Sequence, residues 1–235
     1  MNTDIGCHPT AAILNDYVQG NLSTGLSVAL SAHLELCSMC RERSSELESE
    51  AAMSFMQAHA EDGASDFSHL IADIVSQPQA QDGSDGEAVS SKCSIAEIHM
   101  LDHSFTLPRV LAKAANEGLV WKKLPGGINQ ATVDIDTETQ CEFIYMSPGS
   151  QTPVHRHQGS EVTLVLDGSF KDESGVYKPA DFIIRSGKDE HQPVSEEGCL
   201  CFAVLDSPLT FTRGLARLFN PINRYKFRKT IAQQS

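Results

Sequence analysis

The chain has 235 residues, 40% of them hydrophobic, and its 31 acidic against 18 basic side chains give a formal net charge of −13. This length suits one or two packed domains and argues against wholesale disorder. The charge disfavours direct binding to nucleic acids or anionic lipids; it favours a basic protein partner, or serves solubility alone. No apolar run approaches the roughly 20 residues of a membrane helix, no signal peptide is visible, and the seven cysteines are scattered. We therefore expect a cytoplasmic protein without a membrane segment.

The first 75 residues have the apolar period of helices. A first helix ends near Gly20, and its apolar stripe is Ile13, Leu14, Tyr17 and Val18. Ser23 can cap a second helix, whose apolar residues are Leu26, Leu30, Leu34 and Leu47. A third helix is predicted around 53–56 and a fourth over 67–75. Helices this short bury a small core, and such a domain often needs a metal or disulfide staple.

A polar stretch follows, and beyond it the pattern changes to short strands. Residues 76–95 are predicted to be a linker, because large apolar side chains are absent until Val89. A helix is predicted over 107–115, followed by β-type runs at 131–135, 141–146, 161–166, 181–185 and 199–205. Several short strands separated by turn residues favour an antiparallel barrel or sandwich. The basic tail beyond Arg213 is predicted to be a terminal strand or an extended segment.

The predicted architecture is therefore an α + β chain of two domains. A small all-α domain occupies 1–75, the linker 76–95, an antiparallel β-barrel or jelly roll 96–220, and a tail 221–235.

Four residues with metal-ligand side chains occur in the predicted helical domain. His33, Cys37 and Cys40 follow at i, i+4 and i+7, so within one helix they project from the same face. Structural zinc takes four such ligands; His8 can supply the fourth by folding back, and Cys7 is its rival. The alternatives are plain packing or a thioredoxin-like redox pair, although the βαβ surroundings of such a pair are absent from the pattern.

This spacing resembles the zinc-binding anti-sigma domain, marked by a His, three residues, a Cys, two residues and a Cys, with an upstream His. The resemblance covers roughly residues 1–75. It implies a helical domain that wedges between the two conserved domains of an extracytoplasmic-function sigma factor and keeps them from RNA polymerase. An acidic domain would be attracted to the basic surfaces of that partner. The zinc would be structural, contributing on the order of 10 kcal/mol to folding.

A second set of ligand-type residues lies in the predicted β domain. His155 and His157 are two residues apart in a strand, so both imidazoles point to the same face. Glu161 begins the next strand within reach of the same point. Two imidazoles and a carboxylate suit Zn, Fe, Mn, Ni or Cu. The spacing of these three residues between Gly149 and Gly168 resembles the first cupin motif.

The second cupin motif is matched more loosely. Ala180 stands at its leading Gly, Ser186 at its Pro, and Gly187 is shifted by one position. His191 stands where the fourth metal ligand is expected. The alternative is a cupin that has lost its metal, but four buried polar side chains would then need other partners.

Cys199 and Cys201 alternate along a predicted strand, so both thiols point to one side. They could line the barrel near the metal and report oxidation. Equally, they could be ordinary core residues, since buried cysteines are common.

The order of the two domains, from His8 to about Leu205, resembles the ChrR family of anti-sigma factors. The resemblance implies zinc at His8, His33, Cys37 and Cys40. It implies Zn or another divalent transition metal at His155, His157, Glu161 and His191. It further implies that the helical domain binds an extracytoplasmic-function sigma factor and that the cupin domain directs its release under oxidative stress such as singlet oxygen.

The expected function is thus regulation of transcription and not catalysis. The main rival is a metal-dependent cupin enzyme, of the dioxygenase or isomerase type, with a helical docking domain. A weaker rival is a redox or metal sensor that acts on another partner.

Overall fold

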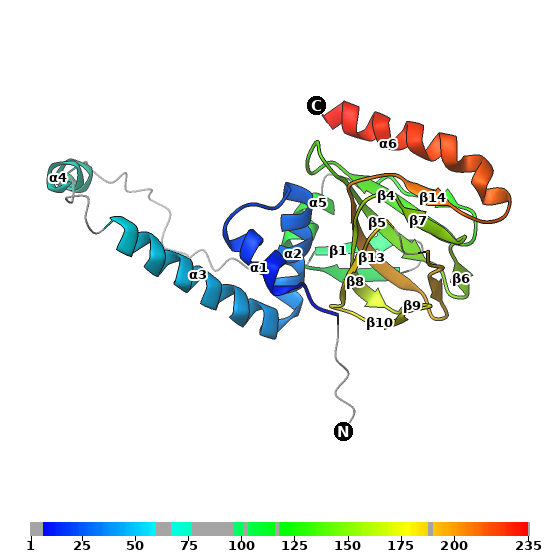
Figure 1. The fold of residues 1–235 in the computed structure, drawn as a ribbon, viewed down its shortest axis with the longest axis horizontal. Helices are drawn as coiled ribbons and strands as arrows, with labels where there is room; N and C mark the ends of the chain where they lie inside the picture. Colours follow the sequence, from blue (N-terminus) through cyan, green and yellow to red (C-terminus); the bar gives the residue numbers. More distant parts are fainter. Residues whose placement is uncertain are drawn as a thin grey trace, which may run out of the picture.

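The computed structural model describes residues 7–59, 67–76, 96–100, 103–115, 118–187 and 190–234 (Figure 1). The helices are α1 (Ala11–Val18), α2 (Thr24–Leu36), α3 (Ser38–His59), α4 (Ser68–Ser76), α5 (Arg109–Ala115), the 3-10 helix η1 (Leu215–Phe219) and α6 (Asn220–Gln234). The strands are β1 (Ala96–Met100), β2 (His103–Leu107), β3 (Lys122–Leu124), β4 (Ile128–Val133), β5 (Gln140–Met146), β6 (Ser150–Gln151), β7 (His155–His157), β8 (Glu161–Gly168), β9 (Phe170–Asp172), β10 (Gly175–Tyr177), β11 (Phe182–Arg185), β12 (Val194–Ser195), β13 (Cys199–Leu205) and β14 (Leu209–Phe211).

The N-terminal helices α1 to α3 form what we call the helical module. The hydroxyl of Thr10 accepts a hydrogen bond from the Ile13 N–H at the start of α1, and the hydroxyl of Ser23 accepts one from Leu26 at the start of α2. Such caps satisfy backbone donors that have no partner within a helix. Helix α3 extends away from the strands, and Figure 1 draws α4 beyond its far end.

The prediction of one helix from Ser23 to Leu47 was wrong. Helix α2 ends at Leu36, and the backbone of Cys37 is extended, with φ −116° and ψ 107°. Helix α3 then runs without a break through the position predicted for a separate third helix. The break changes the direction of the chain between His33 and Cys40, so these side chains do not project from one continuous helix. The predicted linker falls almost entirely outside the described residues.

The strands form antiparallel sheets, as the pattern predicted. The largest has the order β11-β8-β13-β5-β4-β3, and a second has the order β10-β9-β12-β6. Two-stranded sheets pair β1 with β2 and β14 with β7. We call β1 to β14, together with α5, the β module. All five strands predicted from the pattern occur, with ends that differ by a few residues.

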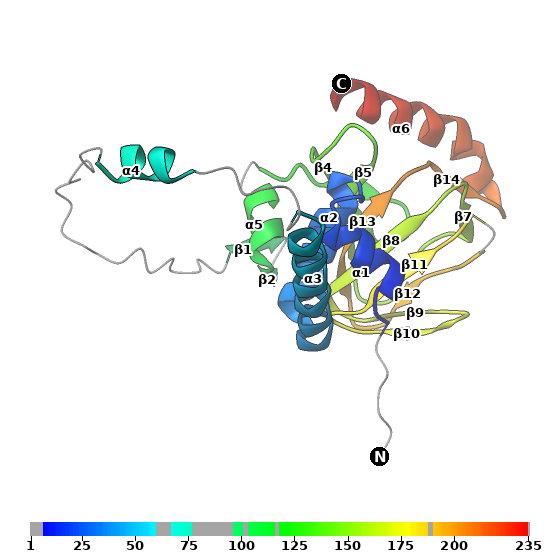
Figure 2. The same cartoon turned by 60° about the vertical axis from the view of Figure 1, so that its left-hand side comes forward.

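Both faces of the six-stranded sheet are buried. On one face Phe143 and Phe202 join a cluster that also contains Leu30 of α2 and Leu111 of α5. On the other face Met146 belongs to an interior cluster that faces the four-stranded sheet and includes Val165, Cys199 and Cys201. Figure 2 shows the helical module and α5 against the same side of the strands. The helical module therefore shares a core with the β module.

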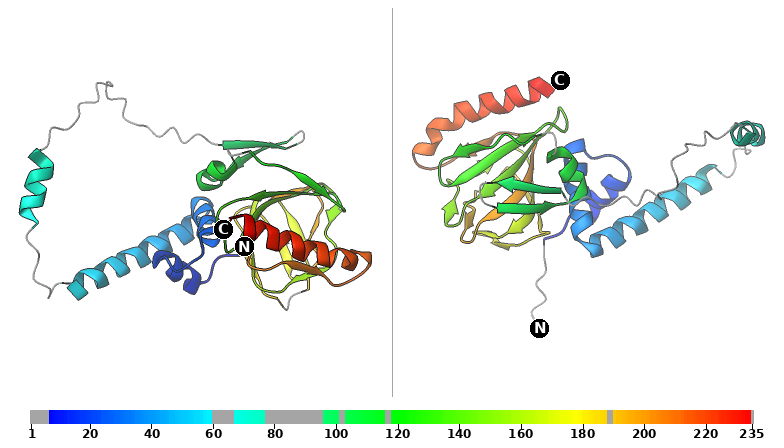
Figure 3. Two further views of the ribbon diagram at one scale, coloured as in Figure 1. Left: turned by 90° about the horizontal axis from the view of Figure 1, so that it is seen from above. Right: turned by 180° about the vertical axis from the view of Figure 1, so that it is seen from behind.

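The prediction for the C-terminal tail was also wrong, because it is helical. Gly214, with φ 66°, follows β14 and allows the chain to turn. Pro221 lies in the first turn of α6, where a missing N–H costs nothing. The Asn220 side chain bonds both backbone groups of Phe211, at 2.8 and 3.0 Å, and so ties α6 to β14. Figure 3 shows α6 lying across one end of the β module.

None of the helices within the described ranges combines the length and the apolar character needed to cross a membrane.

Candidate metal centres

The structure brings His8, His33, Cys37 and Cys40 together. One ligand atom from each lies within 4.8 Å of the others. The Nδ1 atom of His8 is 3.6 Å from the Cys37 sulfur and 3.4 Å from the Cys40 sulfur. His8 comes from the segment before α1, His33 from α2, Cys37 from the helix break and Cys40 from the first turn of α3. The break at Cys37, which the sequence pattern did not indicate, is what allows these donors to converge. We call this group the helical site.

His33 is presented as a metal ligand would be. Its ring is fully buried, and its Nδ1 lies 2.9 Å from the carbonyl oxygen of Ala180. Because a carbonyl only accepts, Nδ1 must carry the proton and Nε2 must be unprotonated. Nε2 is buried and has no hydrogen-bond partner among the described residues. Burial lowers the pKa of His33 to about 4, so the ring is neutral near pH 7, as metal binding requires.

The two thiols of the helical site also suit a cation. Burial, with the adjacent Cys37, raises the pKa of Cys40 to about 12. A pair of close thiolates repel one another, and a divalent cation between them removes that penalty. The residues of the helical site therefore fit the imidazole and thiolate set that zinc prefers. Cys7, the rival fourth ligand, lies outside this group and packs against the interior cluster of the β module.

His155, His157, Glu161 and His191 form a second group, again with one ligand atom from each within 4.8 Å of the others. All four residues are buried. The two histidines of β7 lie beside Glu161 at the start of β8. His191 is placed by a two-way backbone bridge with His155, with N–O distances of 3.1 and 3.0 Å. We call this group the interior site.

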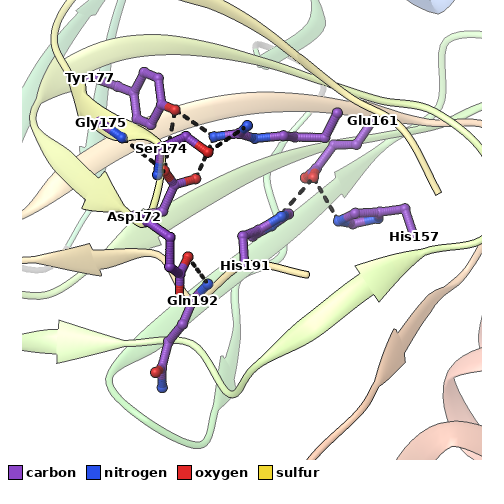
Figure 4. A network of polar contacts seen from close by, with 10 residues as sticks. His157, Glu161, Asp172, Ser174, Gly175, Tyr177, His191 and Gln192 are labelled. Atoms are coloured by element: carbon purple, nitrogen blue, oxygen red, sulfur yellow. Dashed lines mark hydrogen bonds and ion pairs between the residues drawn. The ribbon is translucent and has the colours of Figure 1, made fainter. Parts of the chain in front are cut away.

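The imidazoles of the interior site face one carboxylate. Nε2 of His157 is 2.6 Å, and Nε2 of His191 3.9 Å, from the same Glu161 oxygen (Figure 4). Burial alone would raise the pKa of Glu161, but contact with His157 and the neighbouring imidazoles lower it to about 2. Burial, with the nearby His191, lowers the pKa of His155 to about 4; burial also lowers the pKa of His191. The neutral imidazoles of His155 and His191 beside an ionised carboxylate suit a divalent cation.

The outer nitrogens of the interior site are only partly satisfied. His155 Nδ1 lies 2.9 Å from the Pro153 carbonyl and must donate to it, which leaves Nε2 facing the site. Nδ1 of His157 and Nδ1 of His191 are buried without a hydrogen-bond partner within the part of the chain that the structure describes. Such buried atoms without a partner are costly, and because they are the ring nitrogens on the side away from Glu161, ordered water is the partner that would satisfy them.

Cys199 and Cys201 lie on the interior face of β13, as their alternation predicted. Their sulfur atoms are 3.4 Å apart. The register between β13 and β8 shifts between Leu200 and Cys201, and such bulges re-aim side chains. A hydrogen bond with Cys199, burial and the nearby Glu161 charge raise the pKa of Cys201. Cys201 is therefore close to the Glu161 carboxylate of the interior site and keeps its proton near pH 7.

Two polar clusters near the interior site were not found from the sequence. Arg185 donates to the Asp172 carboxylate at 2.5 Å and also bonds the Tyr177 hydroxyl. Glu142 is fully buried on β5 and accepts hydrogen bonds from two glutamine side chains. Burial raises the pKa of Glu142 to about 7. Glu142 alternates with the apolar Cys141 and Phe143, and this pattern predicts a solvent-facing side chain, so the sequence did not indicate its burial.

The fold and the two donor sets define a cupin-like protein that carries an N-terminal His/Cys module. Residues 112–207 match the family described as the ChrR cupin-like domain. The chain is 31% identical over 225 residues to the anti-sigma-E factor ChrR of Cereibacter sphaeroides, covering 92% of this chain and 97% of that protein. This chain belongs to the ChrR family of anti-sigma factors.

A solved structure supports the same assignment. The crystal structure of Rhodobacter sphaeroides SigE in complex with the anti-sigma ChrR matches with a TM-score of 0.65 and 29% identity. The match covers 85% of this chain and 98% of the other. It therefore spans most of both chains and is not confined to the β module.

Proposed function

We propose that this protein is an anti-sigma factor that binds and inhibits an extracytoplasmic-function sigma factor through its helical module. Zinc held by His8, His33, Cys37 and Cys40 would fix the shape of that module. The binding domain would comprise residues 1–75, joined by a linker at 76–95 to a cupin domain at 96–220. The family assignment supports this proposal, because the relative's solved complex contains SigE.

An exposed apolar surface on α3 and α4 carries the proposal. Eight large apolar residues of this part of the chain are each more than half exposed, from 57% for Met53 to 73% for Val75. We define the α3–α4 surface by these residues: Met53, Phe55, Met56, Phe67, Leu70, Ile71, Ile74 and Val75. Leu70, Ile71 and Ile74 recur at helical spacing on one face of α4, and an exposed apolar face of this kind usually marks a site of protein association. A sigma factor laid along these helices would bury them.

Charge favours a basic partner at the same place. Four glutamates of α3 are exposed, namely Glu42, Glu46, Glu48 and Glu50. Complementary charge accelerates association and helps to exclude wrong partners. An acidic, apolar helix suits the basic, partly apolar surfaces by which a sigma factor meets DNA and polymerase.

Release would originate in the β module. A divalent metal at His155, His157, Glu161 and His191 would supply Lewis acidity or redox reactivity when bound. The Cys199 and Cys201 thiols are the redox candidates, because they lie 3.4 Å apart beside the interior site. A change there drives release only if it stabilises the sigma-free arrangement more than the sigma-bound one.

A co-purification experiment tests the proposed surface. The tagged full chain is co-expressed with a sigma factor encoded beside its gene, and the captured sigma factor is quantified. Ile71→Lys with Ile74→Lys should reduce capture at least about tenfold, because two charges would be buried in an apolar contact. Val176→Lys is the matched control: Val176 is 61% exposed on β10, far from this surface.

Equal capture by the double variant and the control would contradict the proposed surface.

The rival function, a metal-dependent cupin enzyme, can be tested with the same protein. Steady-state turnover of a small substrate, lost on His191→Ala, would favour the enzyme over the regulator.

A further inference from the structure

We infer that residues 180–182, the end of the turn before β11 together with the first residue of β11 and called the turn below, form a positioning contact through which the β module holds two ligands of the helical site, His8 and His33, in their metal-binding geometry. The inference rests on the proposed metal occupancy of the helical site. It assigns the three-residue turn a role in setting the affinity of a metal held by other elements.

The first connection is to His33. The Ala180 carbonyl accepts from His33 Nδ1 at 2.9 Å, which fixes the tautomer and aims Nε2 at the other ligands. The neighbouring Phe182 ring packs edge-on against His33, with centroids 5.4 Å apart, and is almost completely buried. The ring of His33 is thus held by one hydrogen bond and one aromatic contact, both from the turn.

The second connection reaches His8 through its chain neighbour. The Cys7 N–H donates to the Asp181 carboxylate at 2.9 Å. The Phe182 N–H donates to the Cys7 carbonyl at 2.8 Å. Because Cys7 is covalently next to His8, these bonds fix the backbone from which the His8 side chain projects.

The turn is also hydrogen-bonded to β8, the strand that begins with the interior-site ligand Glu161. Ala180 N–H donates to the Val165 carbonyl at 2.9 Å, and Val165 N–H donates to the Asp181 carbonyl at 3.0 Å. Val165 lies on β8, the strand that starts at Glu161. It is fully buried and also pairs with Cys201 of β13. A shift of β8 therefore moves the turn.

The backbone of the turn is held in an unfavourable conformation. Among the non-glycine residues within the described ranges, Ala180 alone has a positive φ, 74°. A residue with a Cβ is disfavoured there, so the surrounding hydrogen bonds must maintain the conformation. Loss of those bonds would let the Ala180 carbonyl turn away from His33.

Cobalt titration of the full chain tests the inference. Of the two candidate sites within the described residues, only the helical site includes thiol ligands, so the thiolate-to-cobalt absorption reports that site. Asp181→Ala removes the acceptor of the Cys7 N–H and a second bond, at 2.8 Å, to the Lys178 N–H. We expect cobalt affinity at the helical site to fall about tenfold or more, as on loss of an outer contact to a metal ligand. The ligand-field bands should also shift at saturating cobalt.

Asp136→Ala is the matched control. Asp136 also caps a loop of the β module and reaches the helical module, where it accepts from the Gly25 N–H at 2.5 Å. It lies away from the ligands, so cobalt affinity should change less than about twofold. If Asp181→Ala does not fold, Asp181→Asn keeps the side-chain shape and should give a smaller shift in the same direction.

The outcomes separate the inference from the proposed function. Absence of a thiolate-to-cobalt band in the wild-type chain would overturn the metal site itself. A wild-type band combined with unchanged affinity and spectrum in Asp181→Ala would overturn the positioning contact alone. Equal losses in the Asp181 and Asp136 variants would also overturn it, because they would indicate general loosening of the two modules.

Discussion

Replacement of Gly25 by alanine should loosen the helical module from the β module. Gly25 lies in the first turn of α2, at the point where that helix meets the loop before β5. A Cβ added there would lie 2.6 Å from the Cys141 sulfur and closer still to the Thr139 hydroxyl. Real Cβ atoms essentially never make contacts under 3.0 Å, so either the helix or the loop must move.

The size of the effect follows from three contributions. Overpacking a well-packed site costs about 1–3 kcal/mol. Displacement of the helix also weakens the bond from the Gly25 N–H to the Asp136 carboxylate, and a hydrogen bond to a charged group contributes about 1.5–3 kcal/mol. Alanine in place of glycine adds about 0.5–1 kcal/mol of stability, because it reduces the conformational entropy of the unfolded chain. The net expected loss is about 2–4 kcal/mol of unfolding free energy.

Urea unfolding of the full chain measures this loss. Circular dichroism follows the helices, and the single tryptophan, Trp121, packs against the cluster shared by both modules, so its fluorescence follows the interface. Gly175→Ala is the control, because its added Cβ would have its nearest neighbour at 4.0 Å. If Gly25→Ala unfolds at the same urea concentration as this control, α2 does not dock on the 136–139 loop and the start of β5 as described.

The remaining predictions concern the interior of the β module. Because burial raises the pKa of Glu142 from 4.5 to about 7, folding favours its protonated form, and the contribution of this one residue to the stability of the metal-free chain should fall by about 2–4 kcal/mol as pH rises from 4 to 8. In urea titrations at several pH values, Glu142→Gln should therefore gain about this amount of stability relative to the wild-type chain between pH 4 and 8; a difference that does not change with pH would contradict the burial of an ionisable Glu142. Phe143→Ala should cost about 3–5 kcal/mol, because a fully buried ring is removed; a loss below about 1 kcal/mol in the same titration would contradict the described core. Elemental analysis should find two metal ions per chain, with one lost in His155→Ala and the thiolate-to-cobalt band retained; loss of both would show that the sites are not separate.

The sequence was informative where chemistry depends on spacing. The alternation of His155 and His157 predicted a shared face for two imidazoles, and the structure places both beside Glu161. The same rule placed Cys199 and Cys201 on one face. Strand period and ligand spacing are local properties, so a single chain displays them directly.

Other features depend on tertiary context and escaped prediction. The extended backbone at Cys37, which lets the donors of the helical site converge, is marked by no helix-breaking residue. The basic tail was predicted to be a terminal strand or an extended segment, yet Asn220 and Pro221 begin a helix there. The contact from His33 to Ala180 joins residues 147 positions apart. The only local sign of that turn was alanine at a cupin position usually held by glycine.

The most direct test of the account is capture of a sigma factor by a chain that lacks the two thiols of the helical site. The double variant Cys37→Ser, Cys40→Ser is co-expressed with the neighbouring sigma factor, purified, and compared with the wild-type chain for bound zinc and captured partner. The account predicts loss of one zinc ion and of nearly all sigma factor, with the secondary structure of the β module retained. Undiminished capture by a variant without zinc in its helical module would contradict it.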